Sequence, residues 1–177
     1  VVSGEEACCG SLTHHMGKES DALARARRSV DQWNAAGVDA VVITASGCGT
    51  TIKDYGHMLR LDPAYAERAA AVSAKAKDVT EFLAGLDLPD GQTSLRLAYH
   101  AACSMQHGQK IRTEPLKLLR KAGFTVAEVP EGHLCCGSAG TYNILQPEIA
   151  AKLRDRKVKN IESTGAVIVA AGNIGCM

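Results

Sequence analysis

The chain has 177 residues, of which 46% are hydrophobic and 22% are charged, and its formal net charge is +1. That length is enough for one domain or two small ones, and a charge so close to zero gives no electrostatic basis for binding nucleic acid or an anionic membrane. No apolar run reaches the roughly 18 residues of a membrane-spanning helix, and no signal peptide is visible.

The first half of the chain opens on a Cys-Cys-Gly motif at residues 8–10. The pattern that follows predicts a helix over residues 19–36, which Gly37 would end. Residues 38–44 have the apolar character of a buried strand, and this strand leads into a loop that contains Cys48.

An alanine-rich stretch separates the two halves. Residues 62–86 predict one long helix opened by Pro63. Residues 87–92, with the sequence Asp-Leu-Pro-Asp-Gly-Gln, are the best candidate for a linker. We therefore expect two domains, residues 1–86 and residues 93–177.

The second half alternates strands with helices. The expected elements are a strand at 95–99, a helix at 113–122, a strand at 124–129, a helix at 147–163 and a strand at 166–170. Each strand is followed by cysteine: Cys103 after the first, Cys135 and Cys136 after the second, and Cys176 after the third. Strands that alternate with helices favour a parallel sheet with right-handed crossovers.

The Cys-Cys-Gly motif occurs twice, at residues 8–10 and again at residues 135–137. Each copy is followed by a helix, a strand and a Gly-Cys pair. We therefore predict an α/β fold of duplicated, Rossmann-like β-α-β-α-β cysteine-rich units with parallel sheets, the first unit being N-terminally incomplete. Because the chain starts at Val1 rather than Met, just before a motif, we expect it to be part of a longer polypeptide.

The carboxyl ends of parallel strands lie at one edge of a sheet, where ligands bind. The four cysteines of the second half are therefore expected to line one pocket. The count of seven cysteines is odd, and adjacent cysteines have poor geometry for a structural disulfide, which favours reduced thiols. Sets of four thiolates typically hold iron–sulfur clusters. The alternatives are zinc, which normally uses more locally spaced cysteine pairs, a dithiol–disulfide active site, and thiols that merely pack in the core.

Three histidines lie near the second set of thiols: His100 and His107 flank Cys103, and His133 precedes Cys135. They could donate hydrogen bonds to cluster sulfurs, accept protons or bind iron. Loop histidines with ordinary hydrogen bonds are the more common case. We place His107, His133 and Gly137 beside the cofactor, the glycine because a loop around a bulky group needs close backbone approach.

The tandem motifs resemble the cysteine-rich domain found in heterodisulfide reductases and, more closely, the family of glycolate oxidase iron–sulfur subunits. The resemblance covers essentially the whole chain. It rests on residues 45–49 (Ala-Ser-Gly-Cys-Gly), 53–58 (Lys-Asp-Tyr-Gly-His-Met), 106–107, 109–110, 133–142 (His-Leu-Cys-Cys-Gly-Ser-Ala-Gly-Thr-Tyr), 153–155 and 173–176.

The resemblance implies an electron-transfer subunit of an oxidoreductase, without the catalytic site itself. Flavin-containing partner subunits would oxidise glycolate to glyoxylate, and electrons would pass towards quinone. It implies that a [4Fe-4S] cluster is held by Cys103, Cys135, Cys136 and Cys176. A sister site would use Cys8, Cys9 and Cys48 together with a cysteine upstream of this chain. The implied location is the cytoplasm, with peripheral attachment to the inner face of the cell membrane through the complex as a variant.

The chain also departs from the wider family pattern. Each unit of that pattern ends with Cys-x-x-Cys, whereas Ala45 and Asn173 stand at the earlier position here. The departure removes a fifth thiol from each site and weakens the case for disulfide-reducing chemistry. A thiol–disulfide reductase component and a structural metal scaffold that docks a flavoprotein remain the alternative functions.

Overall fold

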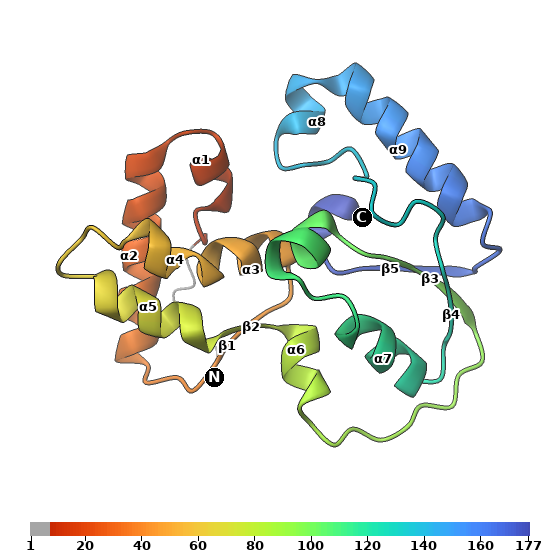
Figure 1. The fold of residues 1–177 in the computed structure, drawn as a ribbon, viewed down its shortest axis with the longest axis horizontal. Coiled ribbons are helices and arrows are strands. Elements are labelled where there is room, and N and C mark those ends of the chain that lie inside the picture. The colour runs from red at the N-terminus through yellow and green to blue at the C-terminus, as the bar shows by residue number, and fades with distance from the viewer. Residues whose placement is uncertain (1–7) are drawn as a thin grey trace. The chain divides into compact units, whose positions relative to one another are not determined.

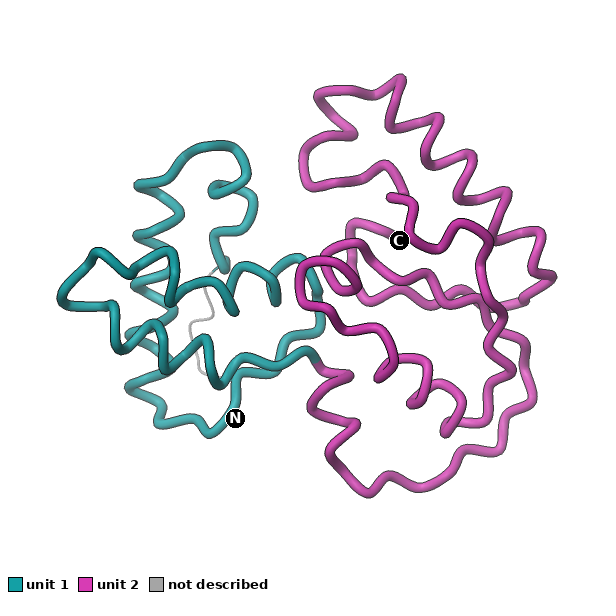
Figure 2. Tube along the Cα trace, in the orientation of Figure 1, with its two compact units in different colours: residues 1–78 teal, residues 79–177 magenta. Residues whose placement is uncertain are grey.

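The computed structural model describes residues 8–177 (Figure 1). The chain divides into two compact units, Val1–Asp78 and Val79–Met177 (Figure 2). Both contain parallel strands together with helices, so the α/β class expected from the sequence is confirmed. The domain boundaries at residues 86 and 93 stay a prediction.

The first unit holds a two-stranded parallel sheet and five helices among its described residues. In chain order they are α1 (Ser11–His15), α2 (Glu19–Ala35), β1 (Val41–Ile43), α3 (Ser46–Lys53), α4 (Tyr55–Met58), α5 (Ala66–Lys75) and β2 (Ala76–Asp78). β1 and β2 pair in parallel, with Val41 opposite Ala76. The core of this unit forms around the fully buried Val30 and Tyr55, and Trp33 stacks on the Tyr55 ring.

The single helix expected over residues 62–86 is interrupted in the structure. α5 ends at Lys75, the three residues of β2 follow, and α6 (Val79–Ala84) begins the second unit. A strand forms here because β1 needs a partner for its backbone groups. Ala76 and Asp78 are buried in the process, whereas Lys77 between them stays exposed.

The second unit is built on a three-stranded parallel sheet in the order β4-β3-β5. After α6, its elements are β3 (Arg96–His100), the π-helix η1 (Ser104–Gln109), α7 (Glu114–Lys121), β4 (Thr125–Ala127), α8 (Tyr142–Leu145), α9 (Pro147–Glu162), β5 (Ile168–Ala171) and the short 3-10 turn η2 (Ile174–Cys176). β3 is the central strand, with Ala98 opposite both Ala127 and Val169. This is the β-α-β-α-β order predicted from the sequence.

Candidate metal centre

Four thiols of the second unit lie in the loops that follow its three strands. Cys103 begins the turn into η1 just after β3, Cys135 and Cys136 lie in the long loop after β4, and Cys176 ends η2 after β5. All four side chains are partly buried, and all seven cysteines of the chain are free thiols. Parallel pairing brings these loops to the same edge of the sheet, although the residues are far apart in sequence.

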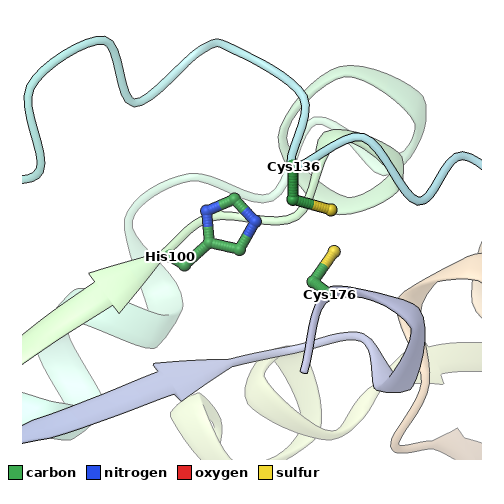
Figure 3. A group of neighbouring side chains, drawn as sticks. All are labelled: His100, Cys136 and Cys176. Atoms are coloured by element: carbon green, nitrogen blue, oxygen red, sulfur yellow. The ribbon is translucent and has the colours of Figure 1, made fainter. Parts of the chain in front are cut away.

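Two of these thiols and a histidine form the tightest group. One ligand atom from each of His100, Cys136 and Cys176 lies within 4.8 Å of the others. Figure 3 shows the three side chains pointing toward one another: His100 from the end of β3, Cys136 from the loop after β4, and Cys176 from the turn after β5. A small group of soft sulfur and imidazole donors of this kind suits a metal ion.

The arrangement of His100, Cys136 and Cys176 favours the ionised form of Cys136. The neighbouring Cys176 thiol and His100 ring lower the pKa of Cys136 to about 4. In return, Cys136 and burial raise the pKa of Cys176. Two adjacent thiols thus share one proton, and the anion on Cys136 is the nucleophilic and metal-binding form at neutral pH.

The other two thiols belong to the same electrostatic cluster. Burial raises the pKa of Cys135, and the neighbouring Cys103 and Cys136 thiols raise it further. The pKa of Cys176 also responds to Cys103. The backbone N–H of Gly137 donates to the sulfur of Cys135 at 3.4 Å. Cys103 and Cys135 thus interact electrostatically with the other two thiols, whereas the compact group of possible metal ligands among the described residues is His100, Cys136 and Cys176.

The three histidines near the thiols differ in their burial. His107 lies in η1 and His133 lies two residues before Cys135, and both are exposed. Among the described residues, neither is in the group that could hold a metal ion. His100, which the sequence analysis weighed with the other two histidines but did not place beside the cofactor, is buried and belongs to that group. Its place as the last residue of β3, at the edge where ligands bind, was the signal available in the sequence.

The glycine that ends each Cys-Cys-Gly motif has the same role in both units. Gly10 has a φ of 82° and Gly137 a φ of 94°, a region that favours glycine. A Cβ on Gly10 would lie 3.2 Å from the carbonyl oxygen of Ala22 in α2, and one on Gly137 would lie 2.3 Å from that of Ala150 in α9. Each motif therefore packs closely against a buried alanine on the long helix that follows it.

Helix α9 also holds the loop that carries Cys135 and Cys136. Glu131 adopts a φ of 52° and pairs with Arg156 through the Nε hydrogen bond of 2.8 Å. Asn160 donates to the same carboxylate at 2.9 Å, and the ammonium group of Lys157 donates to the Glu131 carbonyl oxygen at 2.8 Å. Arg156 and Asn160 lower the pKa of Glu131 to about 2.

A cavity of about 560 Å³ adjoins the thiol cluster. His100, Cys136 and Cys176 line one side, and residues of α9, including Ala150, Lys157 and Ile161, line another. Lys157 is almost completely buried, and burial lowers its pKa while the negative charge of Cys136 and Glu131 opposes that shift. Cys136 and Cys176 therefore border an open space, and Cys176 also packs against the core residues Ala102, Met105 and Ile111.

The first unit brings its three predicted thiols together as well. Cys48 lies in the first turn of α3, where the helix dipole favours an anion. The neighbouring Cys9 lowers the pKa of Cys48 to about 7, and Cys48 and burial raise that of Cys9. Cys8 is exposed, and its proximity to Cys48 opposes this lowering of the Cys48 pKa. Tyr55 fixes this motif by donating its hydroxyl to the Cys9 carbonyl oxygen at 2.8 Å.

The donor set of the second unit fits an iron–sulfur cluster. It offers four thiols, of which one is already ionised by its neighbours, and a glycine-containing loop whose N–H groups reach sulfur. As for membranes, none of the helices that the structure describes is both long and apolar enough to cross one.

Comparison with known proteins supports the same interpretation of the cysteines. The profile of the CCG cysteine-rich domain matches residues 1–53 and 97–177. The chain is 42% identical to the Escherichia coli "Glycolate oxidase iron-sulfur subunit" over 99% of its own length and 44% of that protein. It is 34% identical to the Bacillus subtilis "Probable glycolate oxidase iron-sulfur subunit", covering 41% of it, and 32% identical to the Geobacillus thermodenitrificans "Lactate utilization protein A", covering 73% of it. The chain thus spans less than half the length of the two glycolate oxidase relatives.

Proposed function

We propose that this chain, which belongs to the CCG cysteine-rich domain family, holds a [4Fe-4S] cluster in its second unit and carries electrons. Cys103, Cys135, Cys136 and Cys176 would be the thiolate ligands. The observation that supports the proposal is the position of these four thiols in the loops that follow β3, β4 and β5, together with the electrostatic interactions among them. When bound, such a cluster accepts and donates single electrons without a change of ligands.

The residues around the cluster would have supporting roles. The Gly137 N–H would continue to donate to the Cys135 sulfur, which favours the reduced, more negative cluster. Gly137 would also let the loop approach α9 closely. His107 and His133 are exposed, and we assign them no part in binding the metal.

The first unit would hold part of a sister site. Cys8, Cys9 and Cys48 lie in one electrostatic cluster, in which Cys9 lowers the pKa of Cys48 to about 7. Three thiols would need a further ligand, which the described residues of this unit do not supply as a fourth cysteine.

The wider reaction is inferred from the names of the relatives. Two of them are named as iron–sulfur subunits of glycolate oxidase. We propose that this chain likewise relays electrons in a flavin-dependent complex that oxidises glycolate to glyoxylate and passes the electrons towards quinone. The hydride chemistry would belong to the flavin of a partner protein in that complex. Peripheral attachment at the cytoplasmic face of the membrane would then come through the same complex.

A disulfide-reducing function is the second candidate, because the Cys136 thiolate lines a cavity. The two functions differ in one measurable respect. A disulfide substrate would change the cluster spectrum of a reductase when added to the reduced protein, whereas a pure relay would show no substrate-dependent change.

The decisive experiment is to measure iron and acid-labile sulfide in the full-length protein, purified without oxygen. Cys136→Ser should lose about four iron and four sulfide per chain relative to the wild type, the content of one tetranuclear cluster. His107→Ala is the matched control, because it removes an exposed side chain near Cys103, and its iron content should equal that of the wild type. Equal iron in wild type and Cys136→Ser, or zinc in place of iron, would overturn the proposal.

A further inference from the structure

We propose that His100 is itself a ligand of the metal centre in the second unit, so that the centre has mixed imidazole and thiolate ligation. The inference rests on the proposed function, since it assigns one more donor to the same site. Nothing in the cysteine pattern requires it, and it follows from the surroundings of one side chain.

The first observation is the burial of the His100 ring. The residue is only 3% exposed. Neither ring nitrogen, Nδ1 or Nε2, has a hydrogen-bond partner of ordinary geometry among the described residues, and the ring lies near enough to the Cys136 thiol to lower its pKa. Buried polar atoms in folded proteins nearly always have a partner, so a ring with two unpartnered nitrogens indicates that a ligand normally binds there.

The second observation is where the ring points. His100 is the last residue of β3 and lies opposite Ala171 in β5. A ligand atom of its ring lies within 4.8 Å of the sulfurs of Cys136 and Cys176, and the three side chains converge (Figure 3). In a four-iron cluster Cys136 and Cys176 would bind different irons, and the His100 ring is close enough to both sulfurs to reach the iron that either one binds.

The other histidines near the thiols provide the contrast. His107 and His133 are exposed, so water can satisfy their ring nitrogens. His100 is buried together with its ring nitrogens, and it borders the cavity beside Cys136 and Cys176. The burial of its ring and the direction in which the ring points therefore distinguish His100 from His107 and His133 as the candidate ligand.

Imidazole ligation has consequences for the chemistry. With His100 the site offers five donors, so one iron of a four-iron cluster would carry two protein ligands. A neutral imidazole adds no negative charge, in contrast to a thiolate. Histidine ligation raises the reduction potential of iron–sulfur centres relative to cysteine, so His100 would make the centre easier to reduce than a site with a fifth thiolate.

Pulsed electron paramagnetic resonance of the full-length protein, labelled with ¹⁵N-histidine and poised with the cluster paramagnetic, tests the inference. The wild type should show a ¹⁵N coupling of the size typical of a metal-bound imidazole nitrogen. His100→Gln should lose that coupling, and His133→Ala, the matched control at an exposed site, should retain it. His100→Cys should retain the iron, lose the coupling and shift the reduction potential to a more negative value.

The outcomes separate the two proposals. Suppose the wild type contains the iron of the second-unit cluster but shows no histidine coupling, or shows a coupling that His100→Gln leaves unchanged. Either result overturns the ligation by His100 and leaves the proposed cluster in place. A coupling reduced to the size of a hydrogen-bonded nitrogen overturns it as well, since His100 would then contact the cluster without binding it. Absence of iron overturns the proposed function first, and with it the ligand assignment.

Discussion

The glycine that closes each Cys-Cys-Gly motif is fixed by two separate constraints, a positive φ and a close neighbour. The constraints differ in severity between the two copies. A side chain at Gly137 would lie 2.3 Å from the Ala150 carbonyl oxygen, whereas one at Gly10 would lie 3.2 Å from that of Ala22. Gly165 has a φ of 65° with no atom within 4 Å of the added Cβ, so it isolates the cost of the backbone conformation alone.

We expect Gly137→Ala to destabilise the protein more than either of the other two substitutions. The left-handed conformation costs an alanine about 1 kcal/mol, which should be the whole effect at Gly165. At Gly137 the collision with backbone adds about 2 kcal/mol or more, and Gly10→Ala should fall between them. Denaturant unfolding of the three variants measures these free energies. Equal losses at Gly137 and Gly165 would mean that the contact with α9 relaxes freely.

The protonation state of an individual cysteine also determines how readily it binds metal. Cys136 has a pKa of about 4 because Cys176 and His100 are its neighbours, so it is ready to bind metal without a further loss of a proton. Cys48 has a pKa of about 7 because Cys9 is its neighbour. The two sites should therefore differ in how strongly their metal affinity depends on pH between about 5 and 8, since metal binds the thiolate.

At the scale of elements, the Cys135–Cys136 loop depends on α9 for its position. Glu131 is held by Arg156, Lys157 and Asn160, which lie close together on that helix. The carboxylate is therefore an anchor for a loop that has no regular secondary structure between β4 and α8.

This anchor predicts a pH dependence of stability. The pKa of Glu131 is lowered from 4.5 to about 2 in the folded protein, chiefly by Arg156. A lowered pKa means that the carboxylate stabilises the fold fully above about pH 4.5 and that this contribution is lost as the pH falls through about 2. The melting temperatures of wild type and Glu131→Gln should therefore differ by a constant amount above about pH 5 and converge towards about pH 2.

Thermal unfolding of the metal-free protein, followed by circular dichroism from acid to neutral pH, checks this dependence. Glu128→Gln is a suitable control, because it neutralises an exposed carboxylate shortly before the same loop. A difference between the two curves that stays the same from neutral pH down to about pH 2 would show that the Arg156 pair does not persist in solution, because a carboxyl with the same pKa in both states adds no pH dependence.

At the scale of the whole molecule, the chain consists of two compact units, each with its own parallel sheet. The two thiol clusters lie in different units, Cys9 and Cys48 in the first, and Cys136 and Cys176 in the second. A substitution in one thiol cluster should therefore change the stability of the unit that contains it and leave the other unit unchanged.

We expect Cys136→Ser to lower the hydrogen-exchange protection of β3 and β5 in the full-length protein while leaving β1 and β2 unchanged. Loss of bound metal removes a stabilisation that belongs to the folded second unit alone, and local stability is reported by amide exchange. Mass spectrometry of exchanged peptides resolves the two sheets. Cys48→Ser is the reciprocal variant, and a loss of protection in both units for either substitution would contradict independent sites.

Local sequence patterns predicted the α/β class, the order of elements in the second half and the cysteines that follow its strands. Alternating strands and helices imply parallel strands, and residues that follow parallel strands must gather at one edge. Local patterns therefore predict the position at this edge of Cys103, Cys136 and Cys176.

Only the tertiary structure decided which other groups join them. β2 interrupts a stretch with helical composition because β1, far away along the chain, needs a partner. His100 looks like any loop histidine in the sequence, and its burial beside two thiols depends on β5 and on the loop after β4. Local propensity carries no information about such partners, since the energy of an unpaired strand or an unpartnered imidazole is set by residues far along the chain.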